Sequence, residues 1–160
     1  MSETVMEGTL QVVVFSLLDS KSGKKEDYGV SIEQVREIRP LESITKVPNA
    51  KSYVRGVMNL RGMIIPVVDV KEKLGFSQND TSGSKSRILV ADIDNKLTGL
   101  LIDEVDQVMR IPLKEVENNL SGGLESLEYI NGVAKTSGRL IVLLDISKLL
   151  ENANESHGEQ

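Results

Sequence analysis

The sequence predicts a mainly β protein made of two similar small β-subdomains that pack together. Two stretches, Gly56 to Leu74 and Gly132 to Leu150, follow one pattern in which two glycines, an apolar run and an aspartate keep their spacing. A weaker echo relates residues 29–38 to residues 99–108 at a constant offset. The apolar runs are rich in β-branched side chains, which is typical of buried strands. A repeat of about half the chain in only two copies argues against a stacked array, because such arrays need several short units.

The first elements are strands joined by polar turns. A strand is expected over Thr9 to Leu18, where only Gln11 interrupts the early apolar run, and a polar turn follows over Asp19 to Asp27. Strands over Tyr28 to Ile32 and Val35 to Leu41 come next, with a short helical turn between them. These residues leave open whether the first strand pairs within the first subdomain or crosses to the second.

The first copy of the repeat predicts a β-hairpin. Its strands run from about Val54 to Asn59 and over the apolar run Ile64 to Val68. Gly62 lies at the bend, where a residue with positive φ is often needed and a side chain would cost ~1 kcal/mol or more. Pro66 lacks an amide donor, which places its strand at a sheet edge or beside a bulge.

The second copy predicts a matching hairpin over Tyr129 to Thr136 and Leu140 to Leu144, with Gly138 at the bend. Asp69 and Asp145 end the apolar runs of the two copies, and each precedes a short helical pattern. An aspartate at that point is a preferred helix N-cap, and we assign this role to both rather than the alternative of an acid/base pair. The predicted structural residues are therefore Gly62, Asp69, Gly138 and Asp145.

A polar linker over Gln78 to Lys85 separates the two repeat units. A hairpin over Arg87 to Asp92 and Leu97 to Ile102 follows it, and then a strand over Val105 to Ile111. Residues 113–127 are expected to form a long loop with a helical turn. The predicted organisation is one domain over residues 9–150, with subdomains at about 15–82 and 83–150, between flexible tails over residues 1–8 and 151–160.

The composition offers no catalytic centre. The chain has no cysteine, which excludes disulfides, thiolate metal sites and thiol catalysis. Its one histidine, His157, lies in a polar stretch near the end of the sequence, so no fixed histidine is available to activate a serine. No apolar run reaches the ~20 residues of a membrane span, and residues 1–8 are acidic rather than a basic signal sequence. We therefore expect a soluble cytoplasmic protein that is not an enzyme and holds no cofactor or metal.

Charge and aromatic content disfavour nucleic acid as a partner. The net charge of -5 opposes binding to phosphate backbones, and an aromatic content of 3% leaves few rings to stack on bases. A basic face within the acidic average is the alternative. Its candidate residues are Lys46, Lys51, Arg55 and Arg61, whose simpler interpretation is a solvated rim.

Four segments carry a resemblance to a known family: Tyr28-Gly29-Val30, Val35-Arg36-Glu37-Ile38, the stretch from Val54 to Gly62 that ends in Asn-Leu-Arg-Gly, and Ile65-Pro66-Val67-Val68-Asp69. They look like the CheW family of bacterial chemotaxis coupling proteins. The resemblance covers about residues 9–150. It implies two five-stranded β-barrel-like (SH3-like) subdomains around a shared aliphatic core, with short helices.

The resemblance also implies a function. Members of the family are non-enzymatic signalling adaptors that join the cytoplasmic tips of transmembrane methyl-accepting chemoreceptors to the regulatory domain of the histidine kinase CheA. A cytoplasmic protein recruited to membrane-associated receptor arrays is therefore expected. The matching receptor-groove positions are Val35, Glu37, Ile38, Arg61, Val105 and Val108. The expected kinase-binding positions are Ile44, Val47, Val54 and Val57.

Simpler interpretations stand beside these assignments. Core packing is the alternative for the groove valines and Ile38, because both repeat units keep them. A tether to the other subdomain is the alternative for Arg61, whose planar guanidinium can bind a carboxylate bidentately. Glu37 becomes Gln107 in the echo, so its charge is less readily explained by structure. The rival functions are a small-ligand-binding module that uses the cleft between subdomains and, remotely, a hydrolase.

Overall fold

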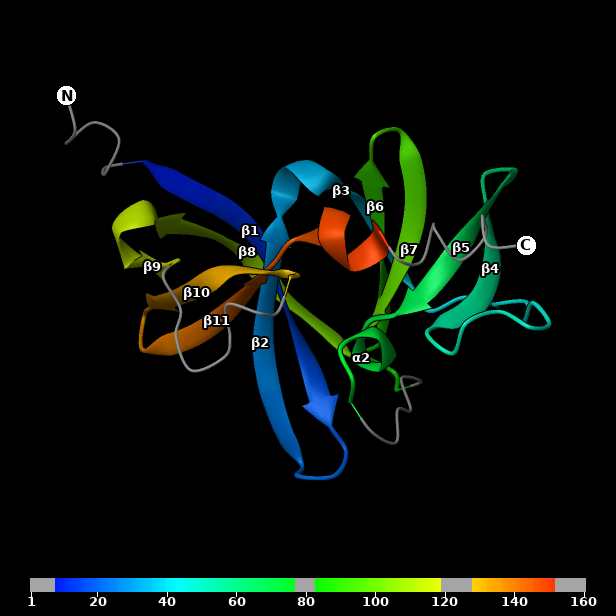
Figure 1. The fold of residues 1–160 in the computed structure, drawn as a ribbon, viewed down its shortest axis with the longest axis horizontal. Helices are drawn as coiled ribbons and strands as arrows, with labels where there is room; N and C mark the ends of the chain where they lie inside the picture. Colours follow the sequence, from blue (N-terminus) through cyan, green and yellow to red (C-terminus); the bar gives the residue numbers. More distant parts are fainter. Residues whose placement is uncertain (1–7, 77–82, 119–127, 152–160) are drawn as a thin grey trace.

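The structure is a computed structural model, and it describes residues 8–76, 83–118 and 128–151. Within these residues the strands form a six-stranded sheet and a five-stranded sheet (Figure 1). The six-stranded sheet contains β1 (Thr9–Asp19), β2 (Lys24–Ser31), β8 (Glu104–Pro112), β9 (Val116–Glu117), β10 (Ile130–Thr136) and β11 (Arg139–Leu144). The five-stranded sheet contains β3 (Val35–Pro40), β4 (Val54–Leu60), β5 (Met63–Asp69), β6 (Arg87–Ile93) and β7 (Lys96–Ile102).

The helical elements are short. They are η1 (Ile32–Gln34), α2 (Val70–Lys73), η2 (Leu113–Glu115) and a helix over residues 146–151. The predicted fold class, mainly β with short helices, is confirmed, although the strands form one six-stranded and one five-stranded sheet where two five-stranded units were expected. His157 and the predicted tails, apart from residue 8 and the helical residue 151, lie outside the described residues, as do most of the predicted linker and part of the loop over residues 113–127.

The two halves of the chain exchange a hairpin. In the six-stranded sheet the order is β8-β1-β2-β11-β10-β9, and in the five-stranded sheet it is β3-β6-β7-β5-β4. The β1–β2 hairpin therefore lies beside β10 and β11 from the second half, as the blue and orange strands of Figure 1 show. The first strand pairs both with β2 and with β8. The hydrogen-bonded sheets consequently divide the chain differently from residues 15–82 and 83–150.

In each sheet, a parallel strand pair joins the two halves of the chain. β5 pairs in parallel with β7, and β11 pairs in parallel with β2, over three residue pairs in each case. Parallel neighbours need a crossover connection rather than a tight turn, so such pairs form between segments that are distant in the sequence. In both repeat copies the second strand of the hairpin, β5 or β11, pairs in parallel with a strand from the other half of the chain. This shared pairing produces the exchange of hairpins between the halves.

Alternation along the strands creates three aliphatic clusters. On β1, Val12 and Val14 belong to a cluster formed only by residues of the six-stranded sheet. The alternate residues Val13, Phe15 and Leu17 point to the other face, into a core that both sheets share. β6 alternates in the same way between the shared core and the interior of the five-stranded sheet. Each fully buried aliphatic side chain stabilises the fold by roughly 1.5–3 kcal/mol. Strands with two buried faces therefore hold the sheets together.

The hairpin turns of the repeat have the same geometry. Arg61 and Gly62 have φ of 50° and 88°, and Ser137 and Gly138 have φ of 52° and 74°. Two consecutive residues with positive φ are typical of a two-residue type I′ turn, which matches the twist of the flanking strands. Both predicted repeat hairpins are confirmed by the pairing of β4 with β5 and of β10 with β11.

The two aspartates of the repeat lie at helix N-termini. Asp69 Oδ1 accepts a hydrogen bond from the Glu72 amide at 3.3 Å, and Asp145 Oδ1 accepts one from the Lys148 amide at 3.2 Å. Burial raises the pKa of Asp69, although the Glu72 amide and the nearby Arg55 guanidinium oppose this rise. The same local cap geometry recurs in both copies because it starts the helix that follows each second strand.

Gly56 is required by a close backbone approach. The pairing of β4 with β5 shifts register between Val54 and Gly56, and residues 44–46 pass close to this irregularity. Gly56 has a φ of 149°, and a Cβ atom there would lie 2.1 Å from the carbonyl oxygen of Thr45. A side chain therefore cannot fit unless the Thr45 segment moves.

Gly56→Ala is expected to lower the free energy of unfolding by about 3 kcal/mol, because overpacking adds to the unfavourable φ. Gly62→Ala is the matched control, since Gly62 also has a positive φ but no atom within 4 Å of a built Cβ. It should lose only about 1 kcal/mol. Urea unfolding of both variants measures the difference. Equal losses would show that the close approach to Thr45 contributes nothing.

Candidate protein-interaction surface

A bidentate ion pair joins two of the predicted groove residues. The Arg61 guanidinium donates from Nη1 to Glu37 Oε2 at 2.5 Å and from Nη2 to Glu37 Oε1 at 3.0 Å. Glu37 lies on β3 and Arg61 lies at the turn between β4 and β5. Because β3 and β4 are the two outer strands of the five-stranded sheet, the pair connects elements from its opposite edges.

The ion pair lies at the surface. The Arg61 side chain is 68% exposed and the Glu37 side chain 21% exposed. Arg39 Nη1 donates a further bond to Glu37 Oε1 at 3.3 Å, and Arg39 Nε donates to Glu42 Oε2 at 2.9 Å. Exposed pairs of this kind contribute little to stability because solvent screens them. The cluster therefore fixes the position of charged groups more than it stabilises the sheet.

The Arg61 hydrogen bond keeps Glu37 ionised. This bond is the main reason that the pKa of Glu37 lies below its ordinary value, with Arg39 adding to the effect. In turn, the hydrogen bond to Glu37 raises the pKa of Arg61. A carboxyl group with a lowered pKa stabilises the folded state above its ordinary pKa and loses that contribution as the pH falls through the lowered value. The pair is therefore intact at neutral pH.

Carboxyl-detected NMR titration tests this pair. Glu37 should titrate below the ordinary glutamate range, and Arg61→Ala should raise its pKa more than Arg39→Ala does, because the Arg61 bond is the largest cause of the shift. The two variants differ only in which guanidinium is removed. A Glu37 pKa that stays the same in Arg61→Ala would show that the pair does not persist in solution.

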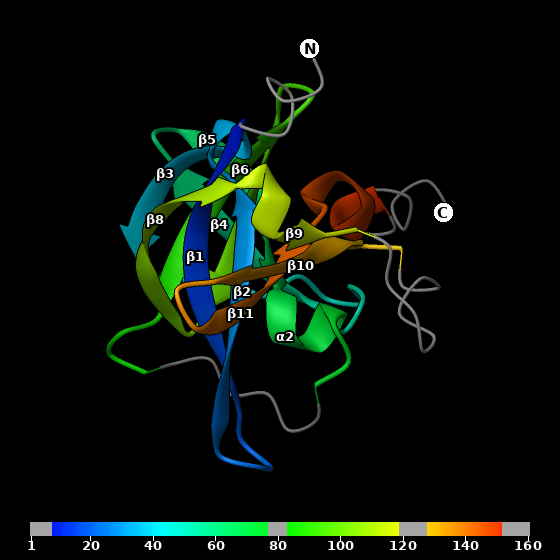
Figure 2. The ribbon, with the colours of Figure 1, turned by 90° about the vertical axis from the view of Figure 1, so that its left-hand side faces the viewer.

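The predicted groove valines and Ile38 divide into two kinds. Val35 and Val105 are half-buried and pack against the shared core. Ile38 and Val108 are 42% and 49% exposed. They lie on β3 and β8, the outer strands of their sheets, which run along the same side of the molecule in Figure 2. Two large aliphatic side chains and the Glu37–Arg61 pair are thus accessible on the outer strands.

The predicted kinase-binding residues gather along the other outer strand, β4. The backbones of Thr45 and Val57 exchange two hydrogen bonds of 2.8 Å, which hold residues 44–46 against β4. Ile44 packs against the interior of the five-stranded sheet, Val54 and Val57 are half-buried, and Val47 is 42% exposed. The predicted kinase surface therefore lies on the β4 edge of the five-stranded sheet, whereas the predicted receptor residues lie on β3, on β8 of the other sheet and at the β4–β5 turn.

The candidate basic cluster is partly neutralised within the chain. Arg61 pairs with Glu37, and Arg55 lies 3.6 Å from Asp69. Lys46 and Lys51 are exposed. Only part of the cluster's charge therefore faces solvent unpaired.

The sequence did not indicate the ion cluster around Arg139. Arg139 Nη2 lies 3.0 Å from Asp27 Oδ2 and 2.9 Å from Asp106 Oδ2. These carboxylates come from β2 and β8, so the cluster connects three strands of the six-stranded sheet. The one available signal was that each repeat hairpin has an arginine next to its turn glycine, at Arg61 and at Arg139.

A buried ion pair joining the two sheets was also missed. Lys71 Nζ lies 3.0 Å from Asp103 Oδ2 and donates a 3.1 Å hydrogen bond to the Leu18 carbonyl oxygen. The Leu18 amide donates to Asp103 Oδ2 at 2.6 Å. The Lys71 side chain is only 2% exposed. This network ties α2 to the end of β1 and to the connection between β7 and β8.

Among the described residues, no group of three or more histidine, cysteine, aspartate or glutamate side chains could hold a metal ion. The described part of the chain also contains no helix that is both long and apolar enough to span a membrane. The features that the structure does place at the surface are outer strands, exposed aliphatic side chains and ordered ion pairs. These are features of a protein-interaction surface.

Comparison with known proteins identifies the family. The model described as the CheW-like domain matches residues 11–154 of this chain. The chain belongs to the CheW-like domain family. The resemblance inferred from the sequence is thereby confirmed, and it extends over both sheets of this CheW-like domain.

Individual relatives agree with the family assignment. The chemotaxis protein CheW of Thermotoga maritima is 37% identical over 128 residues, which cover 79% of this chain and 82% of that protein. The chemotaxis protein CheW of Klebsiella aerogenes is 30% identical over 129 residues, which cover 79% of this chain and 76% of that protein. The crystal structure of the scaffolding protein TtCheW from Thermoanaerobacter tengcongensis matches with a TM-score of 0.75 and 31% identity, covering 89% of this chain and 88% of that chain.

Proposed function

We propose that this protein is a non-enzymatic signalling adaptor that couples transmembrane chemoreceptors to the histidine kinase CheA in bacterial chemotaxis. Membership of the CheW-like domain family and similarity to proteins named chemotaxis protein CheW and scaffolding protein support this role. The adaptor works in the cytoplasm and is recruited to receptor arrays at the membrane. Its partners are the cytoplasmic tips of methyl-accepting chemoreceptors and the regulatory domain of CheA.

The receptor assignment rests on the Glu37–Arg61 pair and on the exposed side chains of Ile38 and Val108, which we call the receptor strip. Aliphatic side chains beside charged ones suit an amphipathic helix, which places its apolar face in a groove and its polar face at the margin. The receptor tip would contact Ile38 and Val108 with aliphatic side chains, while Val35 and Val105 support the strip from beneath. Arg61 would offer the guanidinium donors that Glu37 does not use.

The kinase assignment rests on the β4 edge. Val47 is exposed there, and Ile44, Val54 and Val57 surround the bridge between Thr45 and β4. An aliphatic patch on a different edge from the receptor strip would let one molecule contact both partners at once. Simultaneous binding is what an adaptor requires, because a shared surface would make the partners compete.

NMR titration of the whole chain with each partner separately tests this arrangement. The CheA regulatory domain should shift amide resonances along β4 and residues 44–47, and a receptor-tip fragment should shift those of β3, β8 and the Arg61 turn. The second partner should bind as well when the first is already present. Coincident shift patterns, or competition between the partners, would contradict the proposal.

A further inference from the structure

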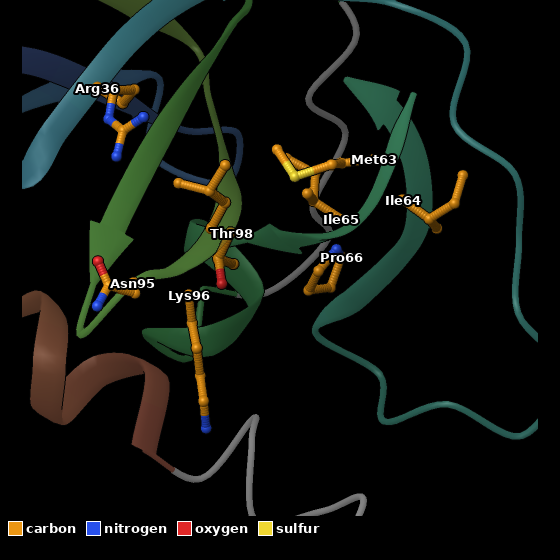
Figure 3. A pocket seen from close by; sticks show the side chains of 9 residues that line it. Arg36, Met63, Ile64, Ile65, Pro66, Asn95, Lys96 and Thr98 are labelled. Atoms are coloured by element: carbon orange, nitrogen blue, oxygen red, sulfur yellow. The ribbon is translucent and has the colours of Figure 1, made fainter. Parts of the chain in front are cut away.

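An open hollow lies where β5 and β7 diverge. The two strands pair in parallel from Val67 and Gly99 onward, but residues 63–66 and 96–98 precede that pairing. Between them is a cavity of about 680 Å³, with Arg36 at its other side (Figure 3). Among the described residues, residues 63–66 pair with β4 alone and residues 96–98 with β6 alone. Each strand therefore has an unpaired backbone edge at the hollow.

The local divergence also explains Pro66. This residue pairs with Val57 of β4, before the ladder with β7 begins. Although β5 is an inner strand of the sheet, Pro66 lies in a segment where its missing amide donor leaves no ladder bond unmade. Of the two predicted places for Pro66, a sheet edge is not found because β5 is an inner strand, whereas the register shift between Val54 and Gly56 lies opposite Val68 and Val67, next to Pro66.

The second repeat copy fills the equivalent place with charged side chains. There, Arg139 lies between Asp27 and Asp106 at 3.0 Å and 2.9 Å and links β11 to β2 and β8. The repeat alignment relates Gly62 to Gly138, Gly99 to Gly29 and Val35 to Val105. By that alignment, each residue of the ion cluster has an equivalent at the hollow: Met63 is equivalent to Arg139, Leu97 to Asp27 and Arg36 to Asp106. One repeat thus closes this site with an ion cluster, and the other leaves it open.

The replacement gives the hollow an apolar floor and a positive rim. Met63 is 50% exposed and points across the hollow toward Thr98 in Figure 3. Leu97 and Pro66 add apolar surface, and Lys96 extends at the mouth. The lining contains two cationic side chains, Lys96 and Arg36, and no carboxylate. Arg36 already pairs with Asp92, so among the described residues Lys96 supplies the unpaired positive charge of the lining.

We propose that this hollow binds an extended acidic segment of a partner protein. An aliphatic side chain of the segment would enter between Met63 and Leu97, and a carboxylate of the segment would lie beside Lys96. Its backbone would pair with the free edge of residues 96–98, as in β-strand addition, where main-chain hydrogen bonds give affinity and side-chain pockets give specificity. The hollow adjoins the receptor strip, because Arg36 lies between Val35 and Glu37 on β3 and Met63 follows the Arg61 turn. Its lining nevertheless contains none of the residues assigned to the receptor or to the kinase.

The test uses the whole chain and two synthetic peptides. The acidic probe is Ac-Glu-Val-Glu-Leu-Glu-Val-Glu-NH2, and the charge-reversed probe has lysine at each glutamate. The acidic probe should shift the amide resonances of residues 63–65 and 95–98, and the basic probe should bind at least about tenfold more weakly. Equal binding of the two probes, shifts confined to other regions or no binding of the acidic probe would each overturn the proposal.

Variants assign the binding to the hollow. Met63→Ser removes the apolar contact without adding charge, and it should weaken the acidic probe about tenfold. Leu140→Ser is the matched control, because Leu140 is a 62% exposed aliphatic residue on the other sheet. It should leave binding unchanged, and both spectra should remain those of the folded protein. Equal effects of the two variants, or self-association of the chain that Met63→Ser abolishes, would contradict the assignment to an acidic partner segment.

Discussion

Asp103→Ala is expected to lower the free energy of unfolding by about 3–5 kcal/mol, because it leaves a buried ammonium group without its counter-charge. Lys71 is 2% exposed and cannot reach solvent without disturbing α2. The same substitution removes the acceptor of the Leu18 amide, which now donates to Asp103 at 2.6 Å. Urea unfolding, followed by circular dichroism, measures the loss.

Two controls separate the buried charge from the loss of a surface group. Glu104→Ala removes the adjacent carboxylate, which pairs with Lys25 at the surface, and should cost at most about 1 kcal/mol. Lys71→Met removes the buried charge at similar volume and should cost less than Asp103→Ala, because Asp103 remains 15% exposed and keeps the Leu18 amide. A loss for Asp103→Ala no larger than that for Glu104→Ala would show that the network does not tie the sheets together.

Arg61→Ala is expected to weaken binding of a receptor-tip fragment by about tenfold or more while leaving the midpoint of urea unfolding unchanged. The fold should persist because Arg61 is 68% exposed and its turn conformation depends on Gly62 as well. Binding should fall because the guanidinium is the most accessible cation of the strip. Titration calorimetry of the whole chain against the receptor fragment measures the affinity.

Arg139→Ala provides the matched control for Arg61→Ala. Arg139 follows the turn of the equivalent hairpin, but its side chain is 29% exposed and bridges two carboxylates. Its loss should lower the unfolding midpoint and leave the affinity for the receptor fragment unchanged. The opposite pattern, with Arg61→Ala less stable but equally able to bind, would identify Arg61 as the tether that the sequence left as an alternative.

The predictable parts of this fold are the local ones. The hairpin turns at Gly62 and Gly138 and the caps at Asp69 and Asp145 depend on neighbours within a few residues, and the repeat shows each of them twice. The exchange of hairpins was not predictable, because the parallel ladders that produce it join segments far apart in the chain. Period and composition carry no signal for such pairing.

At the surface too, features that depend on distant contacts were not predictable. Exposure of Ile38 and burial of Val35 could not be separated in advance, because both positions recur in the repeat and both are aliphatic. Lys71 resembles any solvent-facing helical lysine in the sequence, and only the distant Asp103 explains its burial. The hollow could not be predicted because it depends on a difference between the repeat copies that only the structure explains. Arg139 bridges Asp27 and Asp106, whereas its equivalent, Met63, has no charge with which to form such a bridge.

The proposed adaptor must bridge receptor and kinase. Co-sedimentation of the CheA regulatory domain with receptor-containing membranes tests this role most directly, with and without the whole chain. The kinase domain should sediment with the membranes when the chain is present, remain soluble when it is absent, and return largely to the supernatant with Arg61→Ala. Equal sedimentation of the kinase domain in the presence and absence of the chain would contradict this role.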